Sequence, residues 1–177
     1  ILGGPEISRV YFKGKGRFPA FLRQAADFLV AGEGELALFD FLSGQTKSRT
    51  SVCFRQLKSL EGLDFPRYRG LDLNLYPSRH SMPVQLGRGC IRKCRFCSER
   101  LLYQGYRSRG IQSLMDEMDF HKRQNRIQSF VFFDSLINAD LNLLEQLCDR
   151  MISTFGAVPW QAQMAVRSDM SQELLNK

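Results

Sequence analysis

Three cysteines lie within eight residues of this chain, at Cys90, Cys94 and Cys97, in the pattern C-x3-C-x2-C. This spacing is poor for disulfide bonds and typical of metal ligands. Three thiolates on one short loop can each bind one iron of an iron–sulfur cubane, because each cysteine needs only its own corner. The fourth iron would have no protein thiolate and could be chelated by the amine and carboxylate of a small molecule. The three cysteines therefore predict an iron–sulfur site.

Zinc is the alternative metal for these cysteines. Structural zinc takes four ligands in a tetrahedron, and the sequence has no second C-x2-C or H-x3-5-H half to complete the set. His80 or His121 would have to supply the fourth ligand, in a non-catalytic cysteine-rich module that binds nucleic acid. If His121 binds no zinc, its side chain is expected to be partly exposed. The remaining cysteines, Cys53 and Cys148, are expected to pack rather than react.

The composition describes a basic globular protein. The chain has 177 residues, of which 44% are hydrophobic, and a formal net charge of +7. This length suits one domain, or one domain and a fragment. Much of the basic excess surrounds the cysteines, at Arg88, Arg92, Lys93, Arg95, Arg100, Arg107 and Arg109. These cations favour a site that holds thiolate charge and a carboxylate-bearing cofactor. Nucleic acid is the less favoured partner, because the exposed aromatic residues of a single-strand platform are not interleaved here.

The location of the protein is predicted from what the sequence lacks. No run approaches the roughly 18 apolar residues that cross a bilayer, and no segment resembles a signal peptide. The odd number of cysteines, five, fits a reducing compartment. We therefore expect a cytoplasmic protein without a membrane partner. The opening residues Ile1 to Pro5 resemble the end of a strand and its turn, so we expect a fragment that begins within a longer protein.

The first part of the chain is predicted to be the tail of an α/β unit. Residues 26–30 form a short apolar strand, and a helix follows that ends at Gly44. Leu36, Phe39 and Leu42 recur at helical spacing and are expected to pack on the sheet. Residues 46–82 contain scattered prolines and are expected to be an irregular linker. The predicted divisions are therefore 1–45, the linker 46–82, and 83–177.

The part of the chain that begins at residue 83 alternates strands with helices. The expected strands are 84–86, 127–133 and 160–166, and the expected helices are 110–124, 141–155 and 170–177. The strand 127–133 is continuously apolar, which is typical of burial on both faces. Such alternation predicts an α/β fold with a parallel sheet and right-handed crossovers.

The cysteine loop, with Phe96 just before its last cysteine, resembles the signature loop of radical S-adenosylmethionine (SAM) enzymes. The resemblance implies that Cys90, Cys94 and Cys97 ligate a [4Fe–4S] cluster and that the main chain at Phe96 lies near the adenine of SAM. It also implies an oxidoreductase or transferase that cleaves SAM to methionine and a 5′-deoxyadenosyl radical, which abstracts a hydrogen from a small-molecule substrate. A protein of the flavodoxin or ferredoxin type would donate the electron.

Further segments resemble the subfamily that carries an N-terminal cobalamin-binding domain, which includes anaerobic magnesium-protoporphyrin monomethyl ester cyclases and several methyltransferases. These segments are Gly3-Gly4-Pro5, residues 27–35, Arg88-Gly89-Cys90 and Arg107-Ser108-Arg109. The resemblance places Asp134 and Arg167 near the cofactor and matches Glu117 to a recurrent helix acid. A helix cap at Asp134 and a salt bridge at Arg167 are the alternatives.

Two departures from the subfamily limit the prediction. The D-x-H-x-x-G loop that would supply the lower cobalt ligand is absent, so residues 1–45 match only the end of a Rossmann-like cobalamin-binding domain. Residues 83–177 match about three βα units, which make a partial barrel of the radical SAM type. Cobalamin is therefore expected in the full-length parent, and the fragment alone is expected to be inactive.

Overall fold

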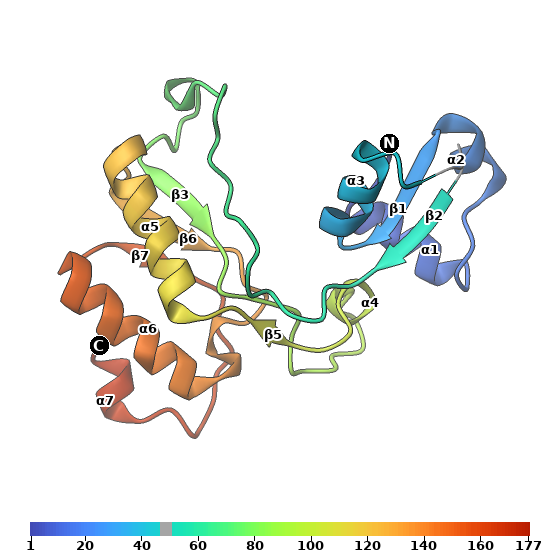
Figure 1. Cartoon of the computed structure of the whole chain (residues 1–177). Helices are drawn as coiled ribbons and strands as arrows, with labels where there is room; N and C mark the ends of the chain where they lie inside the picture. Colours follow the sequence, from blue (N-terminus) through green and yellow to red (C-terminus); the bar gives the residue numbers. More distant parts are fainter. Residues whose placement is uncertain (47–50) are drawn as a thin grey trace. The chain divides into compact units, whose positions relative to one another are not determined.

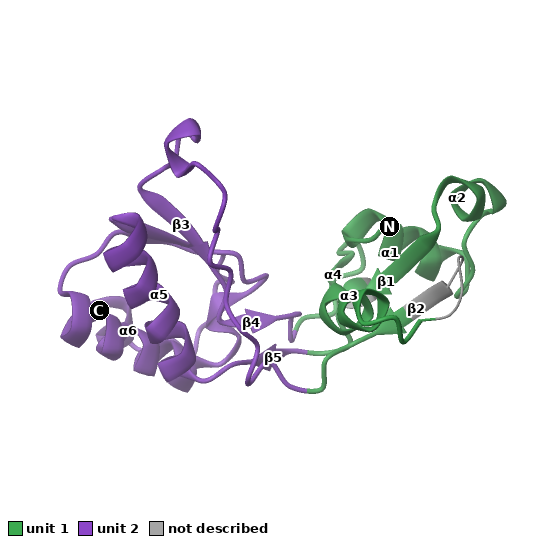
Figure 2. Ribbon diagram, turned by 45° about the horizontal axis from the view of Figure 1, so that its top comes forward, with its two compact units in different colours: residues 1–58, 92–105 green, residues 59–91, 106–177 purple. Residues whose placement is uncertain are grey.

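The computed structural model describes residues 1–46 and 51–177 (Figure 1). These residues form two compact units, shown in different colours in Figure 2. Unit 1 comprises residues 1–58 and 92–105, and unit 2 comprises residues 59–91 and 106–177. The predicted divisions at residues 45 and 82 differ from these, because a strand at residues 51–55 pairs within unit 1 and the middle of the cysteine loop also belongs there.

Unit 1 is built on two parallel strands. Its elements are α1 (Pro5–Lys13), α2 (Ala20–Ala25), β1 (Phe28–Gly32), α3 (Gly34–Leu42), β2 (Ser51–Arg55) and α4 (Glu99–Leu102). Strands β1 and β2 pair in parallel, and a single parallel bridge joins Leu2 to Leu29. Helix α1 begins with Pro5 and has Glu6 in its first turn, and both residue types favour a helix start. Strand β2 lies in the expected linker, and the side chain of Cys53 within it lies outside the described residues.

The buried face of α3 differs from the predicted one. Ala37 is 1% exposed and packs with Phe41 against Phe28 and Val30 of β1. Leu36, Phe39 and Leu42 are 43%, 64% and 73% exposed within the chain, so their predicted packing on the sheet is wrong. Helical spacing alone allowed several apolar stripes, since all but two of the nine residues of this helix are apolar or glycine.

Unit 2 contains the alternating elements that the sequence predicted. They are η1 (Leu73–Leu75), β3 (Ser81–Val84), β4 (Gly87–Arg88), β5 (Arg107–Ser108), α5 (Ile111–Asn125), β6 (Ser129–Phe132), η2 (Ile137–Ala139), α6 (Leu141–Phe155), β7 (Trp160–Gln161) and α7 (Gln172–Leu175). Strands β3, β6 and β7 form a parallel sheet in the order β3-β6-β7, so the α/β prediction is confirmed. The described residues form small sheets and no closed barrel.

Strand β3 begins three residues before the predicted strand and contains Pro83. A proline has no N–H to donate, and it is tolerated here because β3 is an edge strand that pairs only with β6. Because proline is typical of turns and linkers, the predicted strand started after Pro83.

The core of unit 2 lies between one face of the sheet and helices α5 and α6 (Figure 1). Phe130 and Phe132 of β6 are buried there with Met118 of α5 and Leu147 of α6. The other face of β6 is only half-buried, so the prediction of burial on both faces is wrong. Cys148 is buried on α6, as predicted. Among the described residues, no helix combines the length and apolar character that crossing a membrane requires.

Candidate functional site

The cysteine loop leaves unit 2 and returns to it at one place. Strand β4 pairs antiparallel with β5, so that Gly87 lies opposite Ser108. One residue beyond this pair, the N–H of Arg109 donates a hydrogen bond of 2.9 Å to the carbonyl of Leu86. The loop of residues 89–106 is therefore closed at its base by main-chain hydrogen bonds, directly after the carboxyl end of β3.

Two glycines shape this base. A Cβ atom on Gly87 would lie 2.9 Å from Cε2 of Tyr106 and 3.0 Å from the carbonyl oxygen of Arg107, so no larger residue fits without movement. Gly89 has a φ of +82°, a value that glycine adopts without strain. The path of the chain from the sheet into the loop thus depends on glycine at positions 87 and 89.

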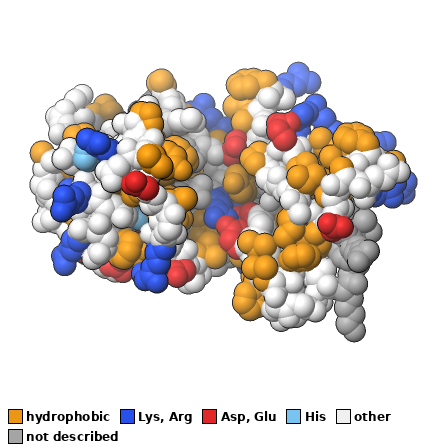
Figure 3. All heavy atoms as spheres, turned by 90° about the horizontal axis from the view of Figure 1, so that it is seen from above, with side chains coloured by type: hydrophobic (Ala, Val, Ile, Leu, Met, Phe, Trp, Pro, Cys, Tyr) orange, Lys and Arg blue, Asp and Glu red, His pale blue; other side chains and the backbone are white. Residues whose placement is uncertain are grey.

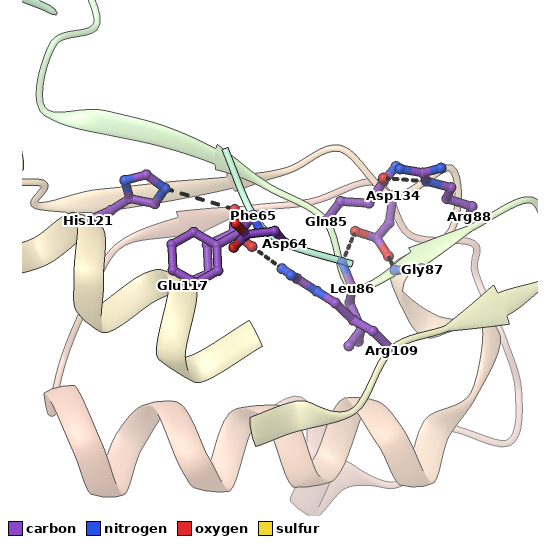
Figure 4. Close-up of polar contacts among 10 residues, drawn as sticks. All are labelled: Asp64, Phe65, Gln85, Leu86, Gly87, Arg88, Arg109, Glu117, His121 and Asp134. Atoms are coloured by element: carbon purple, nitrogen blue, oxygen red, sulfur yellow. Dashed lines mark hydrogen bonds and ion pairs between the residues drawn. The ribbon is translucent and has the colours of Figure 1, made fainter. Parts of the chain in front are cut away.

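Asp134 lies beneath the base of the loop, two residues after the end of β6 (Figure 4). One carboxylate oxygen accepts the N–H of Leu86 at 3.0 Å, and the other accepts the N–H of Gly87 at 2.5 Å. The residue is 2% exposed. Burial raises the pKa of its carboxyl to about 6, although both N–H donors and the charge of Arg109 act in the lowering direction. The predicted helix cap at Asp134 is wrong, because Asp140 caps α6 instead.

The three cysteines are half-buried, and none of them forms a disulfide. Cys90 belongs to unit 2, and Cys94 and Cys97 belong to unit 1, where a turn joins the N–H of Cys97 to the carbonyl of Cys94 at 3.2 Å. Three thiols on one loop are a donor set that suits iron. Across the described part of the chain, no three His, Cys, Asp or Glu side chains are gathered as metal ligands, so the ligand assignment stays a prediction.

A buried ion pair stands beside the loop base. Arg109, which follows β5, donates to the carboxylate of Glu117 on α5, and the two side chains are 8% and 4% exposed. Burial raises the pKa of Glu117 against the lowering effect of Arg109. His121, one turn further along α5, is fully buried, with Nε2 3.9 Å from Glu117, and burial lowers its pKa. The expected partial exposure of His121 is therefore wrong, since segment 65–68 packs over it.

A cavity of about 290 Å³ opens beside this ion pair, wholly within unit 2. Polar residues of the loop base, Arg88, Arg109 and Glu117, line it together with the apolar side chain of Phe133. Segment 60–68 forms another wall. The cavity can accept a small molecule that has both a polar and an apolar part. This wall was not predicted, because the segment lies in the expected linker 46–82, although apolar residues recur within it.

Phe96 and Arg167 are the other predicted cofactor contacts. The Phe96 side chain is 93% exposed. Arg167 holds both carboxylate oxygens of Asp169, at 2.9 and 2.7 Å, and donates to the carbonyl of Asn138 at 2.7 Å. The salt bridge weighed as the alternative for Arg167 is thus present. A contact of Phe96 or Arg167 with a cofactor stays a prediction.

The basic residues do not form a single patch on the face drawn in Figure 3. On the face drawn in Figure 3, lysine and arginine side chains occur at several separate places among acidic and hydrophobic ones. The arginines nearest the loop base are partly buried, and Arg109 is engaged by Glu117. Positive charge near the loop base therefore contributes to the packing of unit 2.

Sequence comparisons relate the chain to enzymes. No protein-family model matches it. It is similar to an uncharacterized methyltransferase (sll1242) from Synechocystis sp. (strain ATCC 27184 / PCC 6803 / Kazusa), with 34% identity over 98 residues, or 54% of this chain and 18% of that protein. It is also similar to the anaerobic magnesium-protoporphyrin IX monomethyl ester cyclase of the same organism, with 21% identity over 146 residues, or 72% of this chain and 29% of that protein. The chain thus spans less than a third of either relative, and both are named as enzymes.

Proposed function

We propose that this chain is part of a radical SAM enzyme, in which Cys90, Cys94 and Cys97 hold a [4Fe–4S] cluster. The observation that carries the proposal is the three-cysteine loop on a closed base at the carboxyl end of a parallel strand, where open α/β sheets bind their ligands. The two relatives add support, since the cyclase by name belongs to the group that the loop resembles.

The residues of this chain would bind and orient the reactants. When bound, the cluster and SAM supply a one-electron cleavage of the sulfonium bond and a radical that takes a hydrogen from the substrate. The three thiolates would hold three irons, and Phe96 and Arg167 are proposed contacts for SAM. For the whole protein we propose a methylation or a ring closure, after the names of the two relatives.

Two partners complete the proposal. A small electron-transfer protein of the flavodoxin or ferredoxin type would supply the electron, and the exposed cations Arg92, Lys93 and Arg95 next to the thiols suit an acidic donor. We assign no cobalamin ligand within unit 1, because its residues include no histidine.

Anaerobic reconstitution with iron and sulfide tests the metal assignment. The chain is expected to bind about four irons with a broad visible absorbance, as a cubane cluster requires. Replacing Cys90, Cys94 or Cys97 by alanine should abolish cluster assembly. Cys148→Ala and Cys53→Ala are the matched controls and should leave it intact, with far-UV circular dichroism to confirm folding. Tight binding of one zinc ion without uptake of iron would overturn the proposal in favour of a zinc module.

A further inference from the structure

The main chain of Leu86 and Gly87 is the junction from which the cysteine loop departs. The N–H groups of both residues donate to Asp134, and the carbonyl of Leu86 accepts from Arg109 on the returning side of the loop. Figure 4 shows the Asp134 side chain pointing at this junction. Hydrogen bonds at Leu86 and Gly87 thus join three parts of the chain. These parts are the segment that follows β6, the start of the loop and the end of the loop.

The junction suits a carboxyl group. Two consecutive N–H groups point to one side chain, and a group with two oxygen atoms can accept from both. An asparagine has one acceptor oxygen, and its amide group would face the second N–H. An alanine would leave both donors buried without a partner, which is costly in the interior. Asp134 is 2% exposed, so water cannot readily replace it.

The surroundings of the junction leave the loop base little freedom. Tyr106 and the carbonyl of Arg107 occupy the space where a side chain on Gly87 would lie. The cap of the next helix is supplied by Asp140, whose carboxylate accepts the N–H of Leu143 at 3.1 Å. The Asp134 side chain therefore bonds to the loop base and does not cap α6.

We propose that Asp134 is a positioning residue that fixes the direction in which residues 88–91 leave the sheet of unit 2. The inference rests on the proposed function where it concerns the cluster: a loop held at Leu86 and Gly87 presents its first ligand, Cys90, at a constant place. Loss of the carboxylate loosens the base of the loop and lets iron escape faster. This role differs from the direct cofactor contact that the sequence predicted for Asp134.

The test compares Asp134→Ala and Asp134→Asn with Asp140→Ala, a matched control in which a nearby carboxylate also accepts a main-chain N–H. In the chain without iron, hydrogen exchange of the Leu86 and Gly87 amides is expected to become about tenfold faster or more in Asp134→Ala, and unchanged in Asp140→Ala. In the reconstituted chain, iron release to a chelator near neutral pH should be fastest for Asp134→Ala and intermediate for Asp134→Asn, which keeps one acceptor. The EPR signal of the reduced cluster should broaden in the same order.

The two measurements, hydrogen exchange and iron release, test the inference and the proposed function separately. Unchanged exchange at Leu86 and Gly87 in Asp134→Ala would overturn the positioning role, whatever the chain binds. Failure of the unsubstituted chain to take up iron would overturn the proposed function, and the exchange arm would still decide the role of Asp134 in the loop base. If Asp134→Ala does not fold, Asp134→Asn carries both arms, because it preserves the shape of the side chain.

Discussion

Replacing Glu117 by alanine removes one partner of the buried ion pair beside the loop base. The guanidinium of Arg109 would stay buried, with its side chain 8% exposed and its Nε atom already without a hydrogen-bond partner among the described residues. Removing one partner of such a pair typically costs about 3–5 kcal/mol, because an uncompensated charge is left in the interior. For a unit of about 100 residues this lowers Tm by roughly 14–23 °C.

The double replacement should cost much less. Burial raises the pKa of Glu117 in spite of Arg109, so desolvation of the carboxylate outweighs its attraction to the guanidinium. The Arg109→Met/Glu117→Leu variant removes both charges and keeps apolar volume. We expect its free energy of unfolding to lie within about 2 kcal/mol of the unsubstituted chain, because buried pairs are often replaceable by apolar residues.

Urea denaturation followed by tryptophan fluorescence measures the unfolding of unit 2, to which Arg109 and Glu117 belong. The chain has one tryptophan, Trp160, which lies in unit 2. Arg123→Ala is the control on the same helix: it removes an ion pair with Asp119 whose side chains are 75% and 37% exposed, and should cost under about 1 kcal/mol. A cost below about 1 kcal/mol for Glu117→Ala, or simple additivity in the double variant, would refute the reasoning.

Three further predictions concern the loop base and its supports. The folded-state pKa of Asp134, about 6 against an ordinary 3.8, means that its protonation stabilises the fold below about pH 4 and that this stability is lost as the pH rises through 6. Relative to Asp134→Asn, the unfolding free energy of the unsubstituted chain should therefore fall by up to about 3 kcal/mol between pH 4 and 7, and a flat difference in urea titrations would contradict this. Asp140→Ala should cost about 1 kcal/mol through loss of the α6 cap, and an unchanged urea midpoint would argue against that cap. Gly87→Ala should cost about 1–3 kcal/mol because its Cβ meets Tyr106, and an unchanged urea midpoint would count against the crowded base.

The helices of unit 2 were predictable because their apolar residues form one clear stripe. Leu114 and Met118 of α5, and Leu144 and Leu147 of α6, repeat at helical spacing and are all buried. In α3 almost every position is apolar, so spacing could not choose the face, and Ala37 is buried in place of its larger neighbours. Where the hydrophobic pattern is ambiguous, tertiary packing decides.

The contacts of the site residues were less predictable than their identities. The cysteines and Asp134 stood out by type and position. That Asp134 binds the main chain of Leu86 and Gly87 depends on two strands 47 or more residues apart meeting at one edge of a sheet, which local sequence does not encode. The pairing of Arg109 with Glu117 likewise joins a strand end to a helix.

The EPR spectrum of the reduced, reconstituted chain, recorded with and without SAM, tests the central claim most directly. A cluster held by Cys90, Cys94 and Cys97 has one iron without a protein thiolate, so SAM should bind that iron and shift the signal. A cluster signal that SAM leaves unchanged, or a chain that takes zinc and no iron, would contradict the account.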